Sequence, residues 1–178
     1  MYYAGIVTTI LALTPTLSLG TPILAARQIS AFNIGIAQLI WAGDTSRVSQ
    51  FLSMAPSLSG QDLVNAAASA LAAEGDELNQ KGALDAAFLD VDNLDPNVVA
   101  ANTTLVNDGT LQFVVDGLRG LVANGASFTP DQVNMTVTLI NGVRCGTVLP
   151  AIDAYLQAAA ELSGKPLPNA AVRPNNCP

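Results

Sequence analysis

The chain contains no histidine, the side chain that most often acts as a general base. Its absence excludes Ser-His-Asp and Cys-His catalytic sites, histidine zinc sites and the Glu-x-x-His di-iron motif of helical bundles. No glycine-rich phosphate loop follows a strand, so nucleotide chemistry has no visible site, and we expect no cofactor. Any remaining catalysis depends on carboxylates, or on Arg and Lys as electrostatic clamps.

Aromatic and charged residues are also scarce. Only 5% of the 178 residues are aromatic, although half are hydrophobic, so the core must consist of Ala, Leu, Val and Ile. Small side chains of this kind favour closely packed helices over a β-sandwich. Charged residues make up 12%, against about 25% in an average domain. The surface is therefore uncharged polar, glycosylated, or apolar where a partner binds.

Positive charge is too sparse for nucleic-acid binding. The seven basic residues are scattered singly, and the net charge is −7. Because binding to phosphates needs clustered Lys and Arg, we exclude nucleic acid as a partner.

The first twenty residues read as a secretory leader. An apolar run at 6–13 precedes Pro15 and small residues at 18–20, which predicts a signal peptide over 1–20. Its positive charge comes from the α-amino group alone. Pro15 and Pro22 interrupt the run, whereas a membrane anchor needs about 20 continuous apolar residues. We expect a secreted protein, extracellular or in the cell wall, without an integral membrane anchor after cleavage; the alternative is a retained leader.

Residues 21–27 end in Arg27, before Gln28, and form either a pro-segment or an extension that is never trimmed. The chain from residue 28 carries six basic and fourteen acidic residues, a net charge of −8.

The two cysteines, Cys145 and Cys177, predict one disulfide in an exported protein. It closes a loop long enough to stabilise the fold by about 3–4 kcal/mol, and it ties down the Pro- and Asn-rich tail at 165–178. A catalytic thiol is the alternative, but no histidine is present to act as its base.

Two sites fit the N-glycosylation pattern Asn-x-Ser/Thr: Asn102 and Asn134. Both fall in stretches with helical periodicity, which disfavours modification if those stretches pack early.

Apolar residues recur at helical spacing through residues 28–164, which we expect to form one helical domain. Ile29, Phe32, Ile36, Leu39 and Ile40 predict the buried face of a first helix.

Breaks and caps divide the rest of this domain. Gly43-Asp44 is expected to end the first helix, and a second short helix ends before Pro56. Ser59 opens a long helix that Gly75 and Gly82 weaken. Further helices are expected after Asp95-Pro96, over 111–122, after Thr129-Pro130, and over 148–163. The chain is thus predicted to be an all-α bundle of six or seven short helices, with a disulfide-tethered tail.

Half of the acidic residues lie in one segment. They are Glu74, Asp76, Glu77, Asp85, Asp90, Asp92 and Asp95. Two of them about 5–9 Å apart would suit glycoside hydrolysis; the alternative is a solvated helix face followed by a turn.

Asp90, Asp92 and Asp95 alternate like calcium ligands, but Asp95 replaces the EF-hand glycine and Ala101 replaces its final Glu. The favoured interpretation is a polar linker in which Asp95 caps the next helix, with no metal.

Other side chains offer weaker binding hypotheses. Arg47, Arg119 and Arg144 could converge on an anionic substrate, or each could pair with a nearby acid. Trp41 and Phe32 suit the core, and Trp41 and Phe51 become candidates for binding a hydrophobic ligand or surface if Trp41 is exposed beside Phe51.

The uncharged leader, the Ala- and Leu-rich helices, the low charge and the tail KPLPNAAVRPNNCP resemble small secreted proteins of filamentous fungi. These include helical cell-wall and hydrophobic-surface-binding proteins and effector-like proteins of pathogens. The resemblance implies a role at a cell wall or host surface, and it assigns no site residue.

Three functions follow from these observations. The first is a non-enzymatic secreted protein that binds a hydrophobic ligand or surface. The second is an effector that docks on a host protein. The third is an extracellular enzyme using carboxylates or Arg, such as a glycoside hydrolase.

Overall fold

Helices and short connections make up the part of the chain that the computed structural model describes, residues 30–178. No β-strand occurs within these residues, which confirms the predicted all-α class. The signal peptide predicted for residues 1–20 and the pro-segment predicted for 21–27 lie outside them.

Six α-helices follow one another along residues 30–178. They are α1 (Ala31–Met54), α2 (Gly60–Phe88), α3 (Pro96–Asn102), α4 (Thr110–Asn124), α5 (Pro130–Val143) and α6 (Leu149–Ser163). Single turns of 3-10 helix extend α1 over Ala55–Ser57 and α4 over Gly125–Ser127. Two π-helical turns, Thr103–Asn107 and Arg144–Val148, continue α3 and join α5 to α6.

The predicted number of helices was too high. Because the π-helical turn joins α5 and α6 without a break, residues Pro130–Ser163 form one helix of 34 residues, and residues 30–178 hold five continuous helices. The break predicted at Gly43-Asp44 is also wrong, since α1 runs through both residues. Likewise α2 runs through Gly75 and Gly82. Interior glycines cost about 1 kcal/mol each, which the tertiary packing of a long helix offsets.

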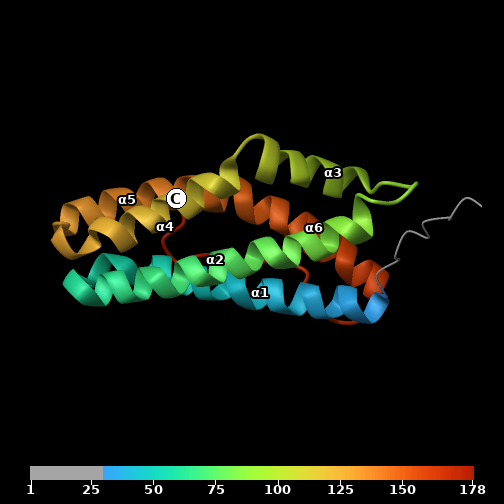
Figure 1. Cartoon of the computed structure of the whole chain (residues 1–178), viewed down its shortest axis with the longest axis horizontal. Coiled ribbons are helices and arrows are strands. Elements are labelled where there is room, and N and C mark those ends of the chain that lie inside the picture. The colour runs from blue at the N-terminus through green and yellow to red at the C-terminus, as the bar shows by residue number, and fades with distance from the viewer. Residues whose placement is uncertain (1–29) are drawn as a thin grey trace, which may run out of the picture.

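Two groups of helices pack along the length of the molecule. Figure 1 shows α1 and α2 as a long antiparallel pair, with α4 and α5 over one end and α3 and α6 over the other. The principal contacts join α1 to α2, α2 to α4, α1 to α6 and α3 to α6. The Pro130–Ser163 helix is apolar and long enough to cross a membrane by length and composition alone, and 44% of its apolar window is buried within the bundle.

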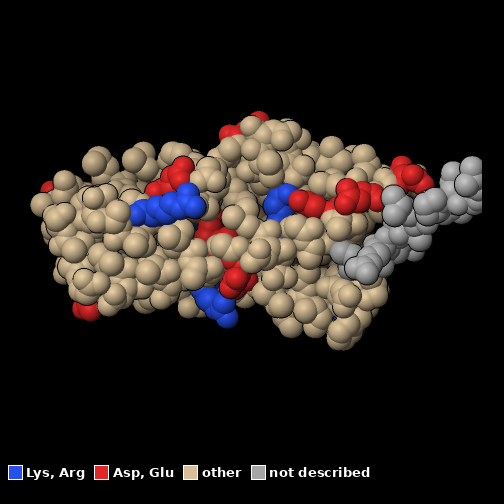
Figure 2. All heavy atoms as spheres, viewed as in Figure 1, with Lys and Arg blue, Asp and Glu red and all other residues tan. Residues whose placement is uncertain are grey.

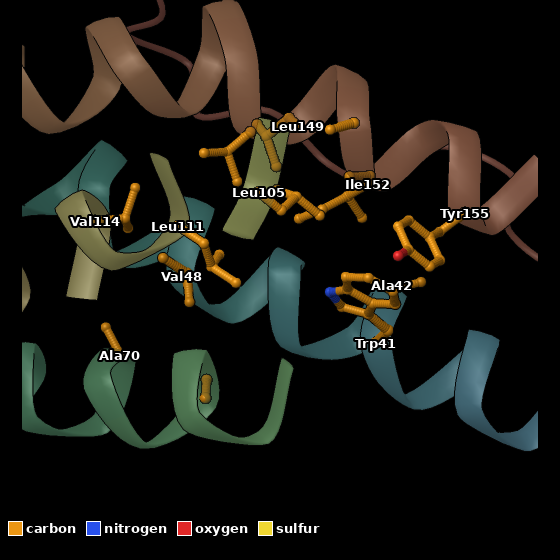
Figure 3. Packing of buried hydrophobic residues seen from close by; sticks show 14 of the residues in the cluster. Trp41, Ala42, Val48, Ala70, Leu105, Leu111, Val114, Leu149, Ile152 and Tyr155 are labelled. Atoms are coloured by element: carbon orange, nitrogen blue, oxygen red, sulfur yellow. The ribbon is translucent and has the colours of Figure 1, made fainter. Parts of the chain in front are cut away.

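Small aliphatic residues fill most of the core, as the composition predicts. In Figure 3, Leu105, Leu149 and Ile152 meet in one layer, while the rings of Trp41 and Tyr155 pack together in the next. The two ring centroids are 5.3 Å apart with planes tilted by 54°, a favourable aromatic geometry.

Two of the predicted helix starts carry the expected caps. Asp95 Oδ1 accepts hydrogen bonds from the backbone N–H groups of Asn97 and Val98. The side chain of Thr129 and that of Gln132 form the reciprocal capping box at the start of α5. Ser59 precedes α2 as predicted, but its side chain makes no capping hydrogen bond.

The tail after Gly164 lies against the helices without forming one. Ser49 Oγ donates to the Val172 carbonyl (2.7 Å), and Asn176 Nδ2 donates to the Leu52 carbonyl (3.0 Å). The predicted disulfide between Cys145 and Cys177 is confirmed and closes a separation of 32 residues. It connects the end of this tail to the π-helical turn at 144–148.

Replacing both cysteines by serine is expected to lower the free energy of unfolding by about 3–4 kcal/mol, because the unfolded chain gains the freedom of that loop. Urea denaturation of the oxidised protein and of the Cys145→Ser/Cys177→Ser variant measures the difference. Equal midpoints and slopes would show that the bridge contributes nothing.

Close packing between α4 and α5 depends on a glycine. A Cβ at Gly117 would stand 2.6 Å from Ile140 Cγ1, which is inside contact distance, whereas a Cβ at Gly120 would meet nothing within 4 Å. Ile140 is itself buried, so it cannot swing away freely.

We therefore expect Gly117→Ala to be destabilising by up to about 2 kcal/mol, since overpacking costs about 1–3 kcal/mol and the gain in helix propensity is about 1 kcal/mol. Gly120→Ala, on the same helix, is the control and should stabilise by up to about 1 kcal/mol. Thermal denaturation measures the stability of both variants. A Gly117→Ala protein as stable as the control would refute the close approach of Gly117 to Ile140.

Candidate functional site: an apolar face on the first helix

The side of α1 predicted to be buried is the side that faces solvent. Phe32 is 61% exposed, Ile36 42%, Leu39 49% and Ile40 42%. These four residues follow helical spacing along the outside of the bundle, and we call them the apolar α1 face. Ile29, assigned to the same face from its spacing, lies outside the described residues.

The buried side of α1 instead carries Gln38 and Trp41, whose side chains bond to other parts of the chain. Gln38 donates to the carbonyls of Leu156 (3.0 Å) and Pro168 (2.8 Å), and Trp41 Nε1 donates to Glu77 Oε2 (3.1 Å). These bonds satisfy the donors of Gln38 and Trp41, whereas Gln38 Oε1 is buried without a hydrogen-bond partner among the described residues. Ile34 and Ala37 pack beside them, at 2% and 4% exposure.

Neighbouring elements mark the edges of the apolar α1 face. The Nζ of Lys165 stands 5.0 Å from the centre of the Phe32 ring, a cation–π distance. On α2, Leu78 is 44% exposed.

No charged side chain occurs on α1 between Ala31 and Gly43. Further along α1, the exposed Arg47 forms an ion pair with Asp44 (2.7 Å). Figure 2 shows how sparse charge is elsewhere: most of the visible surface is neither acidic nor basic, and the charged atoms gather mainly along the middle. An apolar partner can therefore cover Ile36, Leu39 and Ile40 without removing a charged group of this helix segment from water, whereas at Phe32 it also meets the ammonium group of Lys165.

Surface clefts on the described residues are open. One cleft of about 570 Å³ lies between α3 and α6. It is lined by several alanines and by polar side chains that include Asp95, Gln157 and Glu161. A neighbouring cleft of about 480 Å³ shares Asp95 and Glu161. A smaller groove of about 220 Å³ separates Phe51 and Met54 of α1 from Ala66 and Ala70 of α2.

The acids proposed as a catalytic group are divided between core and surface. Glu74 and Glu77 are fully buried and bind Arg144, at 2.8 Å and 2.9 Å. Asp85 accepts hydrogen bonds from Lys81 Nζ (2.6 Å) and Tyr155 Oη (2.6 Å). The remaining members of the segment are exposed or half-buried: Asp76, Asp90, Asp92 and Asp95.

Burial raises the pKa of Tyr155, and the hydrogen bond from Tyr155 Oη to Asp85 raises this pKa further. Tyr155 is therefore held in its neutral form beside Asp85, and the pair has a structural role between α6 and α2.

The linker acids lie at and before the start of α3. Asp95 caps α3, and residues 30–178 contain no group of three or more Asp, Glu or Cys side chains arranged to hold a metal ion. Asp90 and Asp92 stay exposed in the loop before it.

The three arginines do not converge. Arg47 pairs with Asp44 and Arg119 with Asp116 (3.1 Å), each within one helix, whereas Arg144 is buried. Trp41 and Phe51, the weak ligand candidates, are both core residues at 0% and 4% exposure. The exposed Trp41 that the ligand hypothesis required is therefore not found, although Phe51 reaches the small groove beside Met54.

The two glycosylation candidates differ in their surroundings. Asn134 is exposed on α5. Asn102 is half-buried, and its Oδ1 accepts a hydrogen bond from Lys81 Nζ (2.6 Å). Modification thus stays a prediction at both sites, with the freer side chain at Asn134.

Comparisons with protein-family models, curated proteins and solved structures give no match for this chain. The apolar α1 face therefore stands as a candidate on its geometry alone.

Alanine substitutions on the two sides of α1 test its orientation. Ile34→Ala should lower the free energy of unfolding by about 2–5 kcal/mol, because it empties a core position. Ile36→Ala, two residues away, should change it by about 0.5 kcal/mol, as at other surface sites. Chemical denaturation of both variants measures this; a larger loss at Ile36 than at Ile34 would reverse the assignment of faces.

Proposed function

We propose that this chain is a secreted, non-enzymatic protein that binds an uncharged hydrophobic surface through the apolar α1 face. The observation that carries the proposal is the exposure of Phe32, Ile36, Leu39 and Ile40 on a helix segment with no charged residue. The predicted leader at 1–20 and the disulfide support an extracellular location.

Charge favours a neutral surface over an anionic one. Residues 30–178 carry six basic and fourteen acidic side chains, a net charge of −8. Helices that bind anionic lipid surround an apolar face with Lys and Arg, whereas here only Lys165 adjoins Phe32. An anionic membrane would repel the protein as a whole, so an apolar wall component or coating suits it better.

The extent of the face argues against a stable dimer as its principal partner. From Phe32 to Ile40 it extends about 12 Å along α1 and about 10 Å across, an area on the order of a few hundred Å². A stable protein interface buries about 800 Å² on each partner. A flat surface has no such requirement, because many molecules adsorb side by side.

A surface suits the structure better than an enclosed ligand. Carriers of lipid surround most of the ligand in a pocket, whereas the clefts between α3 and α6 and beside Phe51 are open to solvent. The buried space between the helices is occupied by side chains such as Leu105, Leu111 and Ile152.

The two other functions have less support. An effector docking on a host protein would use the same exposed residues, and the size of the face disfavours it. A carboxylate enzyme would need two acids facing a substrate, yet Glu74 and Glu77 are sealed in the core against Arg144.

Removing the apolar side chains should weaken adsorption. We expect the Ile36→Gln/Leu39→Gln/Ile40→Gln variant to adsorb to an alkyl-coated sensor at least about tenfold more weakly than the native protein, since each replacement exposes a polar group to the coating. Binding is measured by quartz-crystal microbalance on the secreted, oxidised protein.

The matched control is Met135→Gln/Leu139→Gln, which removes two side chains that are 61% and 60% exposed on α5. It should adsorb like the native protein. Equal weakening in both variants, or binding only to anionic vesicles, would refute the proposal. Displacement of a fluorescent fatty acid by the protein in solution would favour an enclosed ligand instead.

A further inference from the structure

Three ionisable side chains meet where water does not reach. Glu74, Glu77 and Arg144 each have 0% exposure. Arg144 Nη1 donates to Glu74 Oε2 at 2.8 Å, and Arg144 Nη2 donates to Glu77 Oε1 at 2.9 Å. We call these three residues the buried ion cluster.

The cluster joins parts of the chain that are distant in sequence. Both glutamates lie on α2, one turn apart, and Arg144 begins the π-helical turn between α5 and α6. Trp41 of α1 donates to the second oxygen of Glu77 at 3.1 Å. The cluster is therefore a direct link between the α1–α2 hairpin and the Pro130–Ser163 helix.

Its charges do not balance unless a proton is bound. Two ionised carboxylates and one guanidinium sum to −1, and an uncompensated charge in a dry interior is strongly unfavourable. One added proton makes the cluster neutral. The geometry thus requires that one of the two glutamates be protonated in the folded protein.

Burial raises the pKa of both glutamates, and hydrogen bonding favours Glu74 as the protonated one. Glu77 accepts from two donors, Arg144 and Trp41, which stabilise its ionised form. Glu74 accepts from Arg144 alone, and its buried Oε1 has no hydrogen-bond partner among the described residues. Burial, opposed by Arg144 and reinforced by Glu77, raises the pKa of Glu74 from 4.5 to about 8.

We propose that the buried ion cluster is a proton-dependent latch, closed when Glu74 is protonated and weakened when Glu74 loses its proton. Deprotonation leaves two carboxylates against one guanidinium in the core, so the α1–α2 hairpin and the Pro130–Ser163 helix separate more easily. The protein is then most stable in an acidic environment, independently of what the apolar α1 face binds.

Two other sets of charged groups lie near the latch, Asp44 on α1 and the pair Lys81 and Asp85 on α2. Asp44 of α1 faces Glu77; burial, opposed by Arg47 and reinforced by Asp76, raises the pKa of Asp44. Asp44 Oδ2 is buried without a hydrogen-bond partner among the described residues, while Oδ1 accepts from Arg47, which offsets part of the negative charge that its ionisation adds. Further along α2, Lys81 and Asp85 bind one another.

The sign of the pH dependence follows from the raised pKa. Folding takes up a proton at Glu74, so this stabilisation is fully present below pH 4.5, the ordinary value for Glu, and is lost as the pH rises to about 8. Across this interval the folding equilibrium constant should fall by up to about tenfold per pH unit.

The decisive variant is Glu74→Gln, which reproduces the neutral form at every pH. We expect its unfolding midpoint in urea to change little from pH 5 to pH 8, apart from the contribution of Asp44, while the native midpoint falls. Glu161→Gln, an exposed Glu on α6, is the control and should retain the native pH dependence.

Two results would overturn the latch. One is a native protein whose stability rises between pH 5 and pH 8, and the other is a Glu74→Gln variant with the native slope. If Glu74→Gln does not fold, infrared spectra of the native protein decide instead. A protonated-carboxyl C=O band that persists at pH 7 and disappears in alkali supports the latch; its absence at pH 7 refutes it.

Discussion

The structure depends on the contact between Arg144 and two glutamates of α2. Leaving one partner of such a buried pair without the other typically costs about 3–5 kcal/mol. Because Arg144 belongs to the turn between α5 and α6, this contact fixes how the second half of the chain sits on the α1–α2 hairpin. The π-helical turn places Arg144 on the inner side of a helix that continues unbroken to Ser163.

The same constraint decides which way α1 faces. Trp41 turns inward to donate to Glu77 and to pack on Tyr155, and Gln38 turns inward to bond to backbone carbonyls. Once these residues are inside, helical geometry puts Phe32 and Ile36 outside. The exposed apolar surface is thus a consequence of burying polar and aromatic groups on the opposite side, and it is available to an external surface.

Local signals in the sequence predicted much of the fold. Helical spacing predicted the all-α class. The caps Thr129 and Asp95 predicted two helix starts, and the two cysteines predicted the disulfide. The break at Gly43-Asp44 was wrong, because tertiary contacts outweigh the low helix propensity of those residues.

The candidate site was harder to predict. Apolar residues surround the first half of α1, so spacing alone cannot distinguish its buried side, and the bulkier residues were assigned to the core. The choice depends on hydrogen bonds from Gln38 and Trp41 to residues far away in sequence. The low proportion of charged residues, 12%, indicated apolar surface for a partner as one alternative but did not locate it on α1.

Hydroxyl-radical footprinting of the native protein tests the orientation of α1 most directly, since it compares two aromatic residues on one helix. Phe32 should be oxidised readily, at 61% exposure, while Trp41, at 0%, should be protected although free tryptophan is the more reactive. Rapid oxidation of Trp41 with protection of Phe32 would contradict both the buried ion cluster and the apolar α1 face.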